Sequence, residues 1–150
     1  MKNILKLSLI CSLGLLTTGC NQYITSTTNG DVYYGGYNRR DMIHADVKLF
    51  QKGTNKICDG SVYLNAPSRS ITFKNDRVDA KMVLGCNDGT LIDSNWQLRK
   101  GSFSDGSGEG VDQLNNKYSF KTVSKKEYKK VAEHDKIKFI NDKSESYLKY

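Results

Sequence analysis

The sequence predicts a mainly β domain, a small antiparallel sandwich or barrel with one short C-terminal helix and one disulfide. Apolar residues alternate with polar ones along several segments, and turn-forming residues separate these segments at intervals of about 8–12 residues. The 150 residues include 13 glycines and a single proline. This composition is typical of strands joined by tight turns rather than of a helical bundle.

Several segments show the period of two that a strand with one buried face requires. The first clear one spans residues 43–49, where apolar side chains alternate with His44, Asp46 and Lys48. Trp96, the sole tryptophan, could serve a binding site, but its alternation with Ile92 and Leu98 favours a core position. The residues expected on buried faces are Ile43, Ala45, Val47, Leu49, Val62, Leu64, Ile71, Phe73, Val78, Ala80, Met82, Leu84, Cys86, Ile92, Trp96, Leu98, Tyr118 and Phe120.

Turn signals punctuate these strands at Gly53 and at residues 66–68, 75–76, 88–89 and 115–116. After them, Ser124 and Glu127 form a capping-box sequence that predicts the start of a helix. Its buried face should carry Tyr128, Val131 and Ala132. A last strand is expected over residues 137–140.

The first nineteen residues predict a targeting segment. Lys2 and Lys6 accompany an apolar stretch over residues 4–16, which also holds Cys11, and small residues follow it. This stretch is shorter than the roughly 20 residues that span a bilayer, so a signal peptide fits better than a permanent transmembrane helix. The alternative is an ordinary secretory signal that leaves Cys20 as a spare thiol.

Thr18-Gly19-Cys20 resembles the lipobox of bacterial lipoproteins, in which small residues precede a cysteine that is acylated on sulfur. Thr17 stands where the family usually has leucine. The resemblance covers residues 1–20 and implies a lipid on Cys20 that anchors the protein to a membrane. Asn21 follows, where enteric-type bacteria use aspartate for retention at the inner membrane, so the resemblance implies an outer-membrane protein facing the periplasm.

The chain is expected to divide into a leader at residues 1–19, a lipidated tether at 20–41 and a β-rich domain at 42–150. The tether interpretation rests on the abundance of Thr, Asn, Gly and Tyr over residues 21–41, without a sustained period. A short strand around residues 32–34 and four tyrosines suggest that part of this segment packs on the domain.

Two of the four cysteines, Cys58 and Cys86, remain for the folded domain. An isolated pair in an oxidising compartment most simply forms a disulfide. The alternative is a redox or metal site, which lacks support because there is no Cys-x-x-Cys and the histidines lie far away in sequence.

Residues 102–112 offer a weak candidate for a calcium loop, because oxygen-bearing side chains alternate there with glycines. Asn116 stands where a helix–loop–helix site needs a bidentate acid, so a polar hairpin connection is the better interpretation. The candidate ligands are Asp105, Ser107, Glu109 and Asp112.

No catalytic motif is recognisable, and the sequence predicts neither an enzyme nor a cofactor. His44 and Asp46 should share the outer face of one strand and could perform acid–base work, but a surface pair is the simpler interpretation. His134, in a charged segment, is less specific still.

The formal charge of +7 is spread among acids, without the basic and aromatic interleaving that nucleic-acid sites show, so no nucleic-acid partner is expected. We expect a non-enzymatic envelope lipoprotein that contacts an envelope protein or polymer. The alternative is an inhibitor of a secreted or cell-wall-acting enzyme, or a phage-exclusion factor, that plugs its partner with a loop at residues 105–112.

Overall fold

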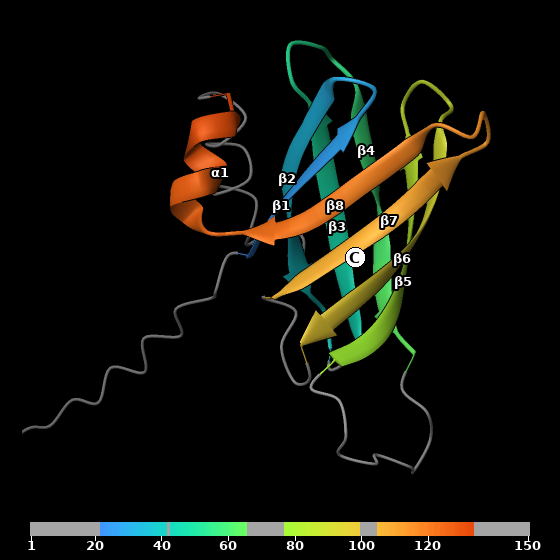
Figure 1. Cartoon of the computed structure of the whole chain (residues 1–150), viewed down its shortest axis with the longest axis vertical. Helices are drawn as coiled ribbons and strands as arrows, with labels where there is room; N and C mark the ends of the chain where they lie inside the picture. Colours follow the sequence, from blue (N-terminus) through green and yellow to red (C-terminus); the bar gives the residue numbers. More distant parts are fainter. Residues whose placement is uncertain (1–21, 42, 66–76, 100–104, 134–150) are drawn as a thin grey trace, which may run out of the picture.

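Eight antiparallel strands close into a barrel in this computed structural model, which describes residues 22–41, 43–65, 77–99 and 105–133 (Figure 1). Each strand pairs with its sequence neighbours, and the first pairs with the last. The prediction of an antiparallel β fold with one short helix and one disulfide is confirmed, and of the two architectures expected the chain adopts the barrel. The strands are β1 (Gln22–Thr28), β2 (Asp31–Arg39), β3 (His44–Gln51), β4 (Ile57–Leu64), β5 (Arg77–Cys86), β6 (Leu91–Arg99), β7 (Gly106–Asp112) and β8 (Lys117–Val123).

The two ends of the barrel differ. At one end, which we call the turn rim, tight turns join β1 to β2, β3 to β4, β5 to β6 and β7 to β8 (Figure 1). Backbone with positive φ at Asn29, Gly30, Gly53, Gly89 and Asn115 makes these turns. At the other end, which we call the N-terminal rim, β1 begins.

Side chains alternate between the inside and the outside of the barrel along each strand, and the inward ones fill its interior. β6 shows the pattern most clearly, since Ile92, Ser94, Trp96 and Leu98 are buried and the residues between them are exposed. The Cys58–Cys86 disulfide joins two cross-strand partners of β4 and β5. The buried side chains form one cluster of Ile24, Tyr33, Ala45, Val47, Leu49, Cys58, Val62, Ala80, Met82, Leu84, Ile92, Trp96, Leu98, Tyr118 and Phe120. Ile43, expected in this core, is 41% exposed because it precedes β3.

The helix α1 (Lys125–Val131) packs on the outside of the barrel. Ser124 caps it, and Ser124 and Glu127 exchange the two hydrogen bonds of a capping box, which confirms the predicted helix start. Its Tyr128 stacks on Tyr23 of β1, with ring centroids 4.3 Å apart. A second cluster therefore lies between the helix and the outer faces of β1, β2 and β3, and it consists of Tyr23, Tyr34, Phe50 and Tyr128.

The tether prediction is wrong for residues 22–39, which form β1 and β2, whereas the short strand expected around residues 32–34 is confirmed as part of β2. The helix buries the outer faces of these strands, so Tyr23 and Tyr34 are as inaccessible as the inward Ile24 and Tyr33. Burial on both faces removes the alternation by which a half-buried strand is recognised. The domain therefore begins about twenty residues earlier than position 42.

Several predictions lie outside the described residues. They are the leader at residues 1–19, the lipid site Cys20, the strands at 71–73 and 137–140, the turns at 66–68 and 75–76, and His134.

Candidate functional site

The interior of the barrel is packed rather than hollow. A cavity lined by apolar side chains including Ile24, Met82 and Trp96 has a volume of about 10 Å³. That is near the minimum needed for a single water molecule. Eight strands enclose an interior just wide enough for side chains to fill, and the inward side chains of the described residues form one buried cluster there. A binding surface would therefore lie on the outside of the barrel.

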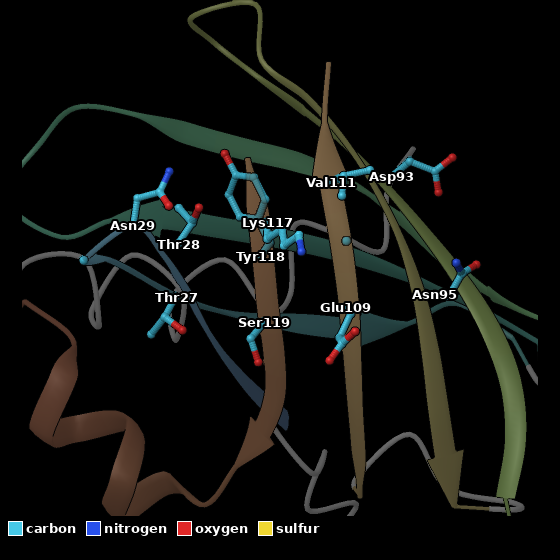
Figure 2. Close-up of a pocket in the computed structure, with 12 residues that line it drawn as sticks. Thr27, Thr28, Asn29, Asp93, Asn95, Glu109, Val111, Lys117, Tyr118 and Ser119 are labelled. Carbon is cyan, nitrogen blue, oxygen red and sulfur yellow. The ribbon is translucent and has the colours of Figure 1, made fainter. Parts of the chain in front are cut away.

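Two adjoining depressions, of about 550 and 650 Å³, lie on the sheet around β6, β7 and β8. Both are lined by Asn95, Glu109 and Ser119, so we treat them together as the outer groove. Figure 2 shows the first of them, with Thr27, Ser119 and Glu109 arranged across neighbouring strands. The side facing the turn rim reaches Val111 and Lys117.

Strand register lines up the polar side chains of the groove. Ser119 is the cross-strand partner of both Thr27 and Glu109, and Glu109 is also the partner of Asn95. Residues two positions along each strand point to the same face, so a second row lies beside the first. That row runs through Lys121, Ser107, Gln97 and Asp79.

Glycines on the inner face of β7 let this strand lie close to its neighbours. A Cβ atom at Gly108 would stand 2.6 Å from Cγ of Trp96, and one at Gly110 would stand 2.6 Å from Cβ of Ser94. Both distances are too short for real contacts, so these positions require glycine. On the outer face, β7 and β8 carry the short side chains of Ser107 and Ser119, which leaves the surface hollowed.

Six polar side chains of the groove have no hydrogen-bond or ion-pair partner within the part of the chain that the structure describes. We name these six side chains the unpaired polar set: Thr27, Asn95, Gln97, Ser107, Glu109 and Ser119. Other charged side chains of the outer face are paired, as in Arg40–Asp46 at 2.7 Å and in Lys81–Asp93 at 2.9 Å, whose Asp93 lines the first depression. Hydrogen-bonding capacity that the fold itself leaves unused is available to a partner.

An apolar margin borders the groove toward the turn rim. Leu91, Val111 and Leu114 are 61%, 45% and 77% exposed. Apolar side chains gathered beside unpaired polar groups are the composition expected of a surface that binds another molecule.

The turn rim is closed by hydrogen bonds to the buried residue Asp112. Its carboxylate accepts from the backbone N–H of Leu114 and Asn116, the Asn116 amide and the Tyr118 hydroxyl, at 2.8–3.2 Å. Burial alone would raise the pKa of Asp112, but these donors together hold it below its ordinary value. Burial, together with the charge of Asp112, raises the pKa of Tyr118.

An ion pair at this rim involves Lys56. Its ammonium lies 2.9 Å from Asp88, and this hydrogen bond, helped by the backbone N–H of Thr90, lowers the pKa of Asp88 to about 2. Asp112 and Asp88 are therefore structural groups of the rim, since each carboxylate is already occupied by donors of its own fold.

The calcium-loop candidate is wrong, and the hairpin connection preferred to it is wrong for residues 106–112, whereas residues 102–104 lie outside the described residues. Residues 106–112 form β7, a regular strand of the barrel. Because side chains alternate along a strand, Ser107 and Glu109 face outward whereas Asp112 faces inward. Asp105, just before β7, bonds Arg77. These four residues cannot converge on one ion.

The acid–base pair considered for His44 and Asp46 is also not formed. The His44 ring lies 2.8 Å from the carboxylate of Asp41, and Asp46 instead binds Arg40. The turn that precedes β3 places Asp41 beside His44, with further hydrogen bonds to the backbone N–H groups of Ile43 and His44. The spacing of two residues places His44 and Asp46 on one face of the strand. It does not predict that the loop before β3 brings the carboxylate of Asp41 to His44.

Most of the groove was not predicted from the sequence. The sequence predicts Ser107 and Glu109 only as calcium ligands, and no pattern in it distinguishes Thr27, Asn95 and Ser119. Each is an ordinary polar residue on the outer face of a strand. The available signal was the run of small polar residues at outward positions of consecutive strands, but it has meaning only once the register is known.

In the described segments, no helix has the length and apolar character needed to cross a membrane. No group of three or more His, Cys, Asp or Glu residues there could hold a metal ion. Comparison with protein-family models, curated proteins and solved structures finds no match to this chain. A function for it therefore rests on its lipobox-like sequence and on the geometry of the outer groove.

Proposed function

We propose that the chain is the precursor of a bacterial envelope lipoprotein that binds another envelope component through the outer groove, without catalysis. The observation that carries the binding role is the unpaired polar set, held in two rows on a rigid sheet. The packed interior supports a surface role over that of a carrier of small molecules.

The anchoring half of the proposal rests on the sequence around Cys20. With two or three acyl chains on the N-terminal cysteine, attachment would be effectively stable. Asn21 stands where aspartate would signal retention at the inner membrane, and this favours the outer membrane, facing the periplasm. Membrane fractionation of the wild type and of Cys20→Ser tests this, together with mass spectrometry of the mature N-terminus. A Cys20→Ser protein that stays in the membrane pellet, or an unmodified N-terminus in the wild type, would contradict it.

The proposed binding role rests on the chemical groups that the groove offers to a partner. Hydroxyl, amide and carboxylate groups at Ser119, Asn95 and Glu109 offer both donors and acceptors along one line. The apolar margin at Leu91 and Leu114 adds surface whose removal from water favours association. An envelope protein or a polar envelope polymer fits this combination.

Crosslinking in intact membranes followed by purification of the full-length protein tests the groove. Glu109→Arg should abolish the crosslinked species, because it places a bulky cation at the centre of the first polar row. Asp59→Arg is the matched control, since Asp59 is an exposed acid of β4 outside the groove. Equal retention of the species in both variants would exclude the groove as the binding surface.

A second candidate is inhibition of a cell-wall-acting enzyme or exclusion of phage, and the lysines of β8 favour it. Lys117 and Lys121 border the groove on the outer face, and Lys117 has no ion pair among the described residues. Enzymes that cleave cell-wall glycans commonly carry two carboxyl groups in an open cleft, and an ammonium held on a rigid strand complements such a site.

This candidate predicts that the protein slows a peptidoglycan hydrolase at stoichiometric concentration. Lys117→Gln should weaken inhibition by tenfold or more, about 1.4 kcal/mol, whereas Lys52→Gln at the β3–β4 turn should leave it unchanged. Hydrolysis that proceeds at the same rate with and without the wild-type protein would remove the inhibitor role and leave envelope binding standing.

A further inference from the structure

The early start of β1 limits how far the barrel could lie from a membrane to which Cys20 is anchored. β1 begins at Gln22, two positions after Cys20. Two residues reach at most about 7 Å, so a lipid on Cys20 would hold the N-terminal rim within that distance of the headgroups. The barrel could not swing far from the surface, and its N-terminal rim would face the bilayer.

The N-terminal rim is rich in basic side chains. We define it by the strand ends, the residues that adjoin them and the start of α1. Its charged groups in the described part of the chain are basic at Arg39, Arg40, Arg77, Arg99, Lys125 and Lys126, with His44 in addition, and acidic at Asp41, Asp105 and Glu127. The basic groups therefore outnumber the acids at the end that the anchor would bring to the membrane.

Two of these arginines form an unusual pair. Arg77 of β5 and Arg99 of β6 are direct cross-strand partners, and both are exposed. Like charges in this position destabilise a sheet. Asp105 compensates one of them, with an oxygen 3.7 Å from Arg77, but the Arg99 guanidinium makes no hydrogen bond or ion pair among the described residues. An anion beside the pair would relieve the remaining repulsion.

Guanidinium groups match phosphate in geometry, because they present parallel N–H donors to two oxygens. Acidic lipid headgroups supply phosphate at the same surface to which the acyl chains attach, and basic side chains next to an anchor are attracted to them.

We propose that the N-terminal rim docks on anionic lipid headgroups through Arg77 and Arg99, fixing the barrel upright with its turn rim pointing away from the membrane. This inference rests on the lipid anchor of the proposed function. It goes beyond anchoring because it assigns an orientation and a lipid class. In this pose the apolar margin of the groove, near the turn rim, stays accessible to a partner.

Trp96, the sole tryptophan, provides a native probe of this pose. It lies three residues from Arg99 on β6, about 10 Å along the strand. The acylated full-length protein is reconstituted into phosphatidylcholine vesicles with or without phosphatidylglycerol, each containing dansyl-labelled phosphatidylethanolamine. Energy transfer from Trp96 to dansyl then reports how closely the N-terminal rim approaches the headgroups.

We expect more transfer with phosphatidylglycerol than with phosphatidylcholine alone. Arg77→Gln/Arg99→Gln should lose most of that difference, as should salt raised to roughly 0.5 M. The matched control is Lys52→Gln/Lys130→Gln, which removes the same charge from the β3–β4 turn and from the last turn of α1, and it should keep the difference.

The outcomes separate docking from anchoring. Equal transfer in both kinds of vesicle, or equal losses in the two double variants, would overturn the docking while flotation of the protein with the vesicles still supports the anchor. A wild-type protein that fails to float with either kind of vesicle would overturn the anchor and the docking together.

Discussion

Gly108 lies on the inner face of β7 against the ring of Trp96, and it leaves no room for a methyl group. Gly108→Ala should lower the free energy of unfolding by about 2–3 kcal/mol, because Trp96 or the backbone of β7 must move. Urea denaturation measures the loss. Gly85→Ala is the control, since its nearest contact would be Leu91 at 3.7 Å, and its expected change is within about 0.5 kcal/mol. Equal losses in the two variants would contradict this packing account.

Asp112 makes a pH-dependent contribution to stability. Its folded pKa lies below its ordinary value, whereas the unfolded carboxyl titrates near about 3.9. The stabilisation is therefore present above about pH 4 and is lost as the pH falls through the folded pKa. Asp112→Asn replaces one acceptor oxygen with an NH₂ group and should cost about 1–3 kcal/mol at pH 7.

Urea denaturation at neutral and acidic pH checks this prediction. The wild type should lose more stability on acidification than Asp112→Asn does, because the variant has no carboxylate to protonate. Asp59→Asn changes an exposed acid of β4 and should behave as the wild type. A deficit of Asp112→Asn that persists undiminished below the folded pKa would show that the carboxylate charge is not the cause.

Periodicity in the sequence predicts elements that bury one face, and these are β3, β5, β6, β8 and α1. The signal failed for β1, where Ser26 and Thr28 point inward and Tyr23 packs under α1 on the outer face. It failed again for β7, whose inner face carries glycines instead of apolar side chains. In both strands, contacts supplied by distant elements replace the local pattern.

The contact between α1 and the barrel depends on the ring of Tyr128 and not on its hydroxyl. That hydroxyl is buried and has no hydrogen-bond partner among the described residues, and burial raises its pKa. Tyr128→Phe should therefore be neutral or stabilising by up to about 1 kcal/mol, since it removes an unsatisfied polar group. Tyr128→Ala should cost about 3–5 kcal/mol because it deletes a ring packed against Tyr23 and Tyr34.

Thermal unfolding of the two Tyr128 variants distinguishes these contributions. A loss in Tyr128→Phe comparable to that in Tyr128→Ala would mean that the hydroxyl has a partner that this structure does not contain.

At the scale of the whole molecule, the sequence could not decide between a sandwich and a barrel. Closure depends on β1 pairing with β8, and β1 lay within the predicted tether. The outer groove could not be predicted for the same reason, because it crosses strands whose register depends on the closure of the barrel. Propensity and periodicity act over a few residues, whereas this pairing joins the two ends of the folded chain.

The position of the domain boundary gives a direct prediction. A chain that begins at residue 42 lacks β1 and β2 and loses Ile24 and Tyr33 from the core. It should be unfolded, with no cooperative transition in urea and no near-ultraviolet circular dichroism, whereas a chain that begins at residue 21 should unfold cooperatively. A cooperative transition in the shorter chain would show that the first two strands are dispensable.

Pairing of the first strand with the last also sets the order of events during synthesis. Tyr23 pairs with Val123 and Thr27 pairs with Ser119, so β1 emerges long before its partner whenever the chain appears N-terminus first, at the ribosome or during export. Until then its free backbone groups form an open sheet edge on which another chain could add a strand, a known route to aggregation. Closure removes both edges at once. The finished barrel offers no such template, whereas the nascent chain needs protection until residue 123 has emerged.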